Sequence, residues 1–78
     1  MKKINVTFSR FEGQGTQSPV FKDTEGNEYF WPASDNLSFE VNPRHFWDEL
    51  GYNKRLRYKI TSKENSGIKY ISGIYGIK

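Results

Sequence analysis

The sequence predicts an all-β domain with one short helix. Apolar and polar residues alternate in several short stretches, which is the pattern of strands with one buried face. The clearest stretch is 4–9, where Ile4, Val6 and Phe8 alternate with polar residues. Polar segments containing glycine or proline separate the stretches, and one segment has helix-terminal signals at both ends. With 78 residues, the chain is expected to form a single domain over 1–78.

Aromatic side chains are expected to supply much of the core. A domain of this size buries only about 60% of its unfolded surface and is marginal unless something reinforces it. The chain has no cysteine, so neither a disulfide nor a thiolate metal site can do so. Aromatic residues make up 17% of the sequence, and large rings bury the most area per residue. We expect these rings to be buried: Phe8, Phe39, Phe46, Trp47 and Tyr58.

The first half is expected to form a strand, a polar loop, a hairpin and another strand. Phe11 follows the strand over 4–9 out of phase, so either a bulge near Arg10 returns it to the core or it lies on the open face. Residues 12–19 read EGQGTQSP and predict a loop. Strands over 20–23 and 28–31 flank a turn in which Gly26 supplies a positive φ. Alternation in NLSFEV then predicts a strand over 37–41.

The second half contains the predicted helix. Asn42 is a favoured N-cap, Pro43 suits the first helical position, and Gly51 stands where a left-handed C-terminal residue belongs. Phe46 and Leu50 lie one turn apart, so the helix is expected to pack against a sheet. Two closing strands are then predicted over 52–62 and 68–78, with a polar loop over 62–67.

This order of elements resembles the OB-fold, a Greek-key barrel, and it is similar to small phage or mobile-element single-strand-binding proteins. The likeness covers essentially the whole chain and is one of topology, without a signature motif. It implies a five- to six-stranded OB-like barrel that binds through 20–31 and the flanking loops 12–19 and 62–67. An SH3-like barrel is the alternative, although it would be expected to lack the helix.

Catalytic chemistry is not indicated by any motif. His45 is the only histidine, and a surface side chain in the first turn of the helix explains it best. Asp48 and Glu49 are adjacent on that helix and point in different directions, so they cannot flank one substrate bond. No nucleophile set, phosphate loop or metal-ligand cluster is present. We therefore expect a protein that is not an enzyme and that uses no cofactor or metal.

The charge is unevenly distributed. Residues 1–40 hold four basic and six acidic groups, for a net charge of −2, whereas 41–78 hold eight basic and three acidic groups, for +5. In the segment YNKRLRYKI, Arg55, Arg57 and Lys59 share one face of a strand, with about 7 Å between successive side chains. Such a row could follow a phosphate backbone, or it could only keep a sheet edge soluble.

The aromatic hairpin is the second functional signal. Tyr29 and Trp31 share one face of their strand, and Phe30 takes the other. If Phe30 is in the core, the other two are exposed; if Trp31 is in the core, Phe30 is the uncovered ring. In either case we expect at least one large ring to be exposed or partly covered, as base stacking requires.

Together these signals predict a non-enzymatic protein that binds single-stranded DNA or RNA by stacking and charge, with weak sequence preference. The predicted nucleic-acid-binding residues are Phe21, Lys22, Tyr29, Trp31, Arg55, Arg57, Lys59 and Lys63. One copy is expected to bind weakly, so a homodimer or a cooperative array would supply useful affinity. The alternative is a small phage or mobile-element protein-interaction module or inhibitor that docks through the aromatic hairpin. This alternative is favoured by the phosphate-repelling carboxylates Asp23, Glu25 and Glu28.

No stretch of 18 apolar residues is present, so we expect no membrane span. The lack of cysteine agrees with a reducing compartment, and the expected location is the cytoplasm.

Overall fold

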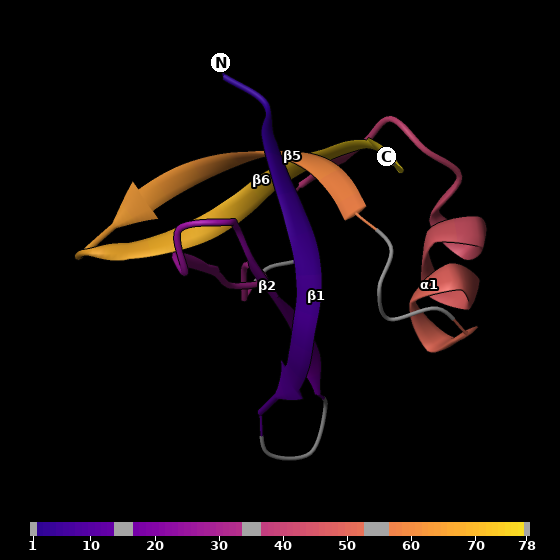
Figure 1. Cartoon of the computed structure of the whole chain (residues 1–78), viewed down its shortest axis with the longest axis horizontal. Helices are drawn as coiled ribbons and strands as arrows, with labels where there is room; N and C mark the ends of the chain where they lie inside the picture. Colours follow the sequence, from indigo (N-terminus) through magenta and orange to yellow (C-terminus); the bar gives the residue numbers. More distant parts are fainter. Residues whose placement is uncertain (1, 14–16, 34–36, 53–56, 78) are drawn as a thin grey trace.

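The computed structural model describes residues 2–13, 17–33, 37–52 and 57–77, and it is a β-rich structure with one helix (Figure 1). Arg55, one of the predicted nucleic-acid-binding residues, lies outside these ranges. In the described ranges the elements are β1 (Ile4–Glu12), β2 (Ser18–Lys22), β3 (Glu28–Tyr29), β4 (Ser38–Phe39), α1 (Pro43–Tyr52), β5 (Arg57–Asn65) and β6 (Ile68–Ile77). The predicted all-β class with a short helix is therefore confirmed. Among the described residues, no helix is long and apolar enough to cross a membrane, since α1 is the one helix there and is short.

The strands form one mixed sheet in the order β3-β2-β1-β5-β6-β4. The sheet is open, because its two end strands, β3 and β4, do not pair with each other. β4 runs parallel to β6, and the other neighbours are antiparallel. β1 is shared between two partners, because its first half pairs with β5 and its second half pairs with β2. In Figure 1, β1 crosses the β5–β6 hairpin and α1 stands to one side of the sheet.

One parallel bridge also links the end of β3 to β6. Phe30 N donates to Lys69 O and Ile71 N donates to Phe30 O, both over 2.9 Å, so that Phe30 is paired with Tyr70. Phe30 follows β3, which stands at one end of the sheet order, and its backbone thus lies beside β6, the next-to-last strand at the other end. This bridge curls the sheet around the core.

Aromatic and aliphatic side chains from β1, β2, β3, α1, β5 and β6 fill that core. Phe46 is its centre, because its ring lies 5.2 Å from Tyr58, 6.0 Å from Trp31 and 6.3 Å from Phe21. The expected burial of Phe8, Phe46 and Tyr58 is confirmed. Phe39 is half-buried against the same cluster.

The helix begins as the sequence predicts and ends later. The side-chain oxygen of Asn42 accepts a hydrogen bond from His45 N over 3.3 Å, which is the N-cap contact. Phe46 and Leu50 are both 1% exposed, so the predicted packing face is confirmed. The prediction that Gly51 ends the helix is wrong, since α1 continues to Tyr52. Burial of Trp47 was also wrongly predicted: it is 42% exposed, because it lies to one side of the Phe46–Leu50 stripe.

Both predicted loops are shorter than expected. The strands β5 and β6 continue to Asn65 and from Ile68, so only Ser66 and Gly67 form the turn of that hairpin. Their φ values of 54° and 80° are those of a tight two-residue turn. The predicted loop over 12–19 is likewise shortened, because β1 extends to Glu12 and β2 begins at Ser18.

β1 contains the bulge that the position of Phe11 suggested. The register of β1 against β2 shifts between Phe8 and Arg10: Phe8 pairs with Phe21, and Arg10 pairs with Val20. The ring of Phe11 then lies 5.0 Å from that of Phe8, yet it remains 40% exposed. Both alternatives given by the sequence are therefore partly realised.

Candidate nucleic-acid interface

The three rings predicted to stack on bases lie in the core. Phe21, Tyr29 and Trp31 are 0%, 3% and 8% exposed, so the prediction that they form a surface platform is wrong. Phe21 and Tyr29 are cross-strand partners and point inward together, and Trp31 follows Tyr29 on the same face. The ring of Phe46 stacks on Trp31 from the helix, with 23° between their planes. Phe30 is the half-buried ring of this hairpin, as the second alternative expected.

Tyr29 can be buried because its hydroxyl has a partner. It donates to Oδ2 of Asp23 over 2.9 Å, which satisfies the polar end of the ring inside the turn. Burial, followed by the nearby Asp23 carboxylate, raises the pKa of Tyr29 to about 12. The same hydrogen bond joins β3 to Asp23, the residue that directly follows β2 and begins the turn.

Three of the predicted cations gather on the outer side of β2, β1 and β5. Lys22 and Arg57 are both cross-strand partners of Thr7, and Lys59 is the partner of Asn5. Directly paired residues point to the same side of a sheet, so these five side chains form one surface, which we call the cationic face. Its members are Asn5, Thr7, Lys22, Arg57 and Lys59, and Glu28, the β3 partner of Lys22, borders it on the same side of the sheet.

The cations of this face are exposed and form no described ion pair. Lys22, Arg57 and Lys59 are exposed, and none forms an ion pair with any residue that the structure describes. Lys63 is also exposed, but it lies further along the β5–β6 hairpin, opposite Tyr70, and is separated from Lys59 by a bulge. The structure thus brings together three of the predicted cations and leaves Lys63 apart from them.

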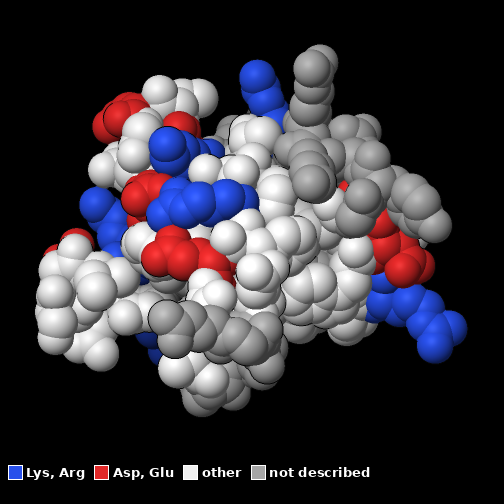
Figure 2. All heavy atoms as spheres, turned by 90° about the horizontal axis from the view of Figure 1, so that it is seen from below, with Lys and Arg blue, Asp and Glu red and all other residues white. Residues whose placement is uncertain are grey.

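On the same side of the sheet, next to Lys22, Arg10 forms ion pairs with Glu12 of β1 and Glu28 of β3. Its guanidinium donates to Glu28 and, over 2.6 Å, to Oε2 of Glu12. These hydrogen bonds raise the pKa of Arg10, and the bond from Arg10 lowers that of Glu28. In Figure 2, basic and acidic side chains touch one another at both the left and the right of the view. This surface, where the resemblance placed the binding face, therefore offers no free cation from Arg10.

The carboxylate of Asp23 is occupied within the hairpin turn. Oδ1 accepts from the backbone N of Glu25 and of Asn27, both over 2.9 Å, and Oδ2 accepts from Asn27 Nδ2 and the Tyr29 hydroxyl. Partial desolvation raises the pKa of Asp23, but the hydrogen bonds from Asn27, Tyr29 and Glu25 outweigh it and leave the pKa below its usual value. Asp23 is a turn-forming residue, with Gly26 at a φ of 87° completing the turn.

A cleft of about 470 Å³ borders the cationic face. Lys2, Lys3 and Arg57 line it on the β1 and β5 side, and Asp23 and Glu25 line it on the side of the turn. Of the three carboxylates that the sequence set against phosphate binding, Glu28 is neutralised by Arg10, and Glu25 is the exposed one. The carboxylates that would repel a phosphate in the cleft therefore lie where the β2–β3 turn lines it.

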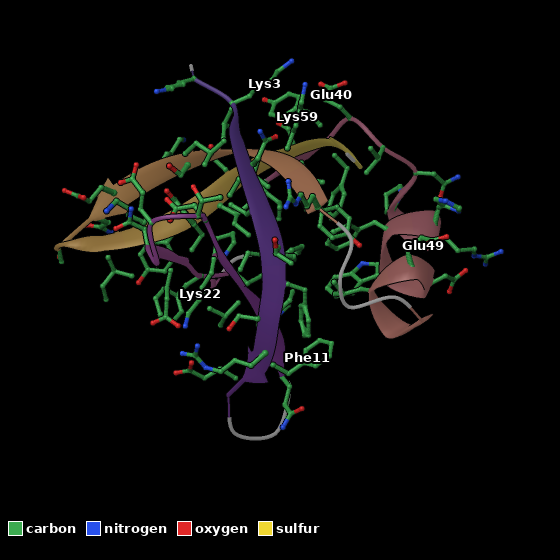
Figure 3. All side chains as sticks on the ribbon, viewed as in Figure 1. Lys3, Phe11, Lys22, Glu40, Glu49 and Lys59 are labelled. Carbon is green, nitrogen blue, oxygen red and sulfur yellow. The ribbon has the colours of Figure 1, made fainter. Side chains whose placement is uncertain are left out.

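A partly exposed ring lies on the same side of the sheet, and sequence reasoning left it unassigned. The ammonium nitrogen of Lys3 lies 4.8 Å from the ring centroid of Tyr75. Lys59 pairs with Gly76, the next residue along β6, so this ring adjoins the cationic face. Lys3 and Lys59 lie near the upper end of β1 in Figure 3, with Glu40 close by. No sequence signal joins Lys3 to Tyr75, because only the strand register brings the two ends of the chain together.

Trp47 forms the other distinct surface feature. Its indole is backed by Trp31 at 5.1 Å and Phe46 at 5.2 Å, so it is held in place although it is 42% exposed. It belongs to α1, which Figure 1 places to the side of the sheet. Within the described residues, no group of three or more His, Cys, Asp or Glu side chains could hold a metal ion.

Comparison with known proteins adds no relative. No protein-family model, no curated protein and no solved structure matches the chain.

Proposed function

We propose that this protein binds single-stranded nucleic acid without catalysing a reaction, and that it does so through the cationic face. The observation that carries the proposal is the register of β1, which sets Lys22 and Arg57 on either side of Thr7 and Lys59 beside Asn5. Three cations from two distant segments are thereby presented on one surface, and none of them forms an ion pair with a described carboxylate, although Glu28 is the cross-strand partner of Lys22. A polyanion is the ligand that such a surface fits.

The dimensions of the face suit one strand of nucleic acid. Lys22 and Arg57 are separated by two strand spacings, about 10 Å, and Arg57 and Lys59 by about 7 Å along β5. This narrow set supports contacts to a few consecutive phosphates of a single backbone. Three phosphate contacts on a single strand predict a slope of log K against log salt of about −2. One copy is therefore a weak binder, and a homodimer or an array along the strand would raise affinity.

An OB-like barrel is the finer fold that we propose. Support comes from the shared strand β1 and from the parallel bridge between Phe30 and Tyr70, which curls an open sheet toward closure. OB-folds are partly open barrels, so an interrupted seam is compatible with the class. The binding surface would lie on β1 and β5 rather than on β2 and β3, because the charge of Arg10 is neutralised there by Glu12 and Glu28. A phage or mobile-element origin and a cytoplasmic location belong to this proposal.

Fluorescence anisotropy of labelled oligo-dT and oligo-rU tests the function directly. Arg57→Gln/Lys59→Gln removes two charges from the cationic face, and Arg44→Gln/Lys63→Gln removes two exposed charges elsewhere. We expect wild type to bind at low salt and to weaken as salt rises. The first double variant should lower the salt slope by about 1.4, and the second should leave it nearly unchanged. Absence of binding by micromolar protein at low salt, or equal losses in the two variants, would reject the proposal.

A protein partner is the second candidate function, and Trp47 is the observation that favours it. An exposed indole held by two further rings is a typical interaction hot spot. The version predicted from the sequence, docking through the aromatic hairpin, loses its exposed Tyr29 and Trp31 rings. Its test is a display selection for peptide or protein ligands: ligands held by wild type should be lost by Trp47→Ser and kept by Arg57→Gln/Lys59→Gln. Ligands insensitive to Trp47→Ser would rule this surface out.

A further inference from the structure

Tyr75 is seated on the sheet by a glycine. A Cβ atom placed on Gly73 would lie 2.8 Å from Cε2 and 2.9 Å from the hydroxyl oxygen of Tyr75. Such distances are shorter than real Cβ contacts, so the ring occupies the space that any other residue at position 73 would fill. The same Cβ would lie 3.0 Å from Oγ1 of Thr61, which pairs with Gly73 across the β5–β6 hairpin. The ring therefore covers Gly73, and Thr61 borders the same space.

A β-bulge accounts for this position. β6 advances from Ile74 to Gly76 while β5 moves only from Ile60 to Lys59, so Tyr75 is the extra residue. Ile74 is fully buried and Thr61 is 2% exposed, whereas Tyr75 remains half-exposed. The ring thus has a fixed support beneath it and an accessible part above it.

Cations frame the accessible part of the ring. The Lys3 ammonium lies over it, 4.8 Å from the centroid, and Lys59 is the cross-strand partner of the adjacent Gly76. Asn5, the partner of Lys59, joins this site to the cationic face. Binding of single strands needs flat rings for bases and cations for phosphates, and beside the cationic face the two occur together.

We propose that Tyr75 is the base-stacking residue of the site and that the ligand is a nucleic acid with accessible bases, rather than duplex DNA or a base-free polyphosphate. This inference rests on the proposed function. A base arriving over Tyr75 would displace the Lys3 ammonium from the ring, since both use the same accessible side. The released ammonium would then be free to contact the phosphate of the stacked nucleotide, while Lys59 and Arg57 hold its neighbours.

The experiment compares two oligomers of equal length and charge, oligo-dT and an abasic oligomer with the same backbone. Tyr75→Leu removes the flat ring, Tyr75→Phe keeps it, and Tyr70→Leu is a control on another half-buried tyrosine of β6. We expect Tyr75→Leu to weaken oligo-dT roughly 5- to 150-fold, the effect of one lost stack, and to leave the abasic oligomer unchanged. Tyr75→Phe and Tyr70→Leu should retain near wild-type preference for oligo-dT.

The outcomes separate this inference from the function beneath it. If Arg57→Gln/Lys59→Gln weakens both oligomers while Tyr75→Leu leaves oligo-dT unchanged or weakens both equally, the stacking role is wrong and the cationic face stands. If wild type binds neither oligomer at low salt, both proposals are overturned. Gly73→Ala, which pushes on the ring without touching Tyr75, should reduce the preference for oligo-dT in the same direction.

Discussion

Lys22 and Arg57 pair with the same residue, Thr7, from opposite sides of β1. One cation comes from the acidic first half of the chain and the other from the basic second half, so their proximity is created by folding alone. The charge asymmetry of the sequence thus understates how the cations are grouped.

A carboxylate placed between the two cations should abolish the site. Thr7 is half-buried on the outer side of the sheet, so Thr7→Glu can present its charge beside Lys22 and Arg57. We expect at least a tenfold loss of oligo-dT affinity at low salt in anisotropy titrations. Gln17→Glu, which changes the net charge equally at an exposed position outside the cationic face, serves as control. Similar losses in both variants would show that only the net charge matters.

Removing the carboxylate next to Lys22 should have the opposite effect. Glu28 is the cross-strand partner of Lys22 and is held by Arg10, so Glu28→Gln frees Arg10 from one partner and removes a charge near the face. Oligo-dT affinity is predicted to rise, and the salt slope to steepen by up to about 0.7. Glu64→Gln removes the same negative charge from the exposed end of β5 and should raise the affinity less. Weaker binding by Glu28→Gln would contradict the placement of the site.

The hairpin turn should lose stability in acid. The pKa of Asp23 is lowered below 3.8 in the folded protein, so its carboxylate contributes stability above about that pH and loses it as the pH falls through the folded pKa. Asp23→Asn should therefore be less stable than wild type at pH 7, with the gap closing below pH 3.8. Urea unfolding at a series of pH values measures this gap. A gap that stays constant down to pH 2 would mean that the charge of Asp23 is not the cause.

Neighbouring rings on α1 should contribute unequally to stability. Phe46 is 1% exposed at the centre of the core, so Phe46→Ala should cost about 3–5 kcal/mol of the free energy of unfolding. Trp47 is 42% exposed, so Trp47→Ala should cost no more than about half of that. Chemical unfolding followed by circular dichroism compares the two. Equal costs would mean that Trp47 is more deeply engaged than its exposure indicates.

Local signals in the sequence predict the elements well. Alternation identifies β1 through Val6 and Phe8, and the Asn42–Pro43 start identifies α1, because both patterns depend on residues near one another. The polar residues before Ser66 concealed the length of β5 and β6. The Ser66–Gly67 pair was the signal for the tight turn, and it lay within the predicted loop.

Distant partners decide what the sequence left open. Alternation shows that Tyr29 and Trp31 share a face, but only the ring of Phe46, supplied by a later helix, makes that face the inner one. The contact between Lys3 and Tyr75 depends on strand register and on a bulge in β6. The cations of the candidate site were predicted in part, whereas its ring was not.

Amide chemical-shift mapping of the protein with oligo-dT at low salt tests directly whether the cationic face and Tyr75 hold the nucleic acid. We expect shifts that cluster at Asn5, Thr7, Lys22, Arg57 and Lys59 and extend to Tyr75, with α1 unaffected. Shifts centred on Trp47 and its helix, or on Phe30 and the outer side of β3, would contradict it, as would a spectrum that does not change at all.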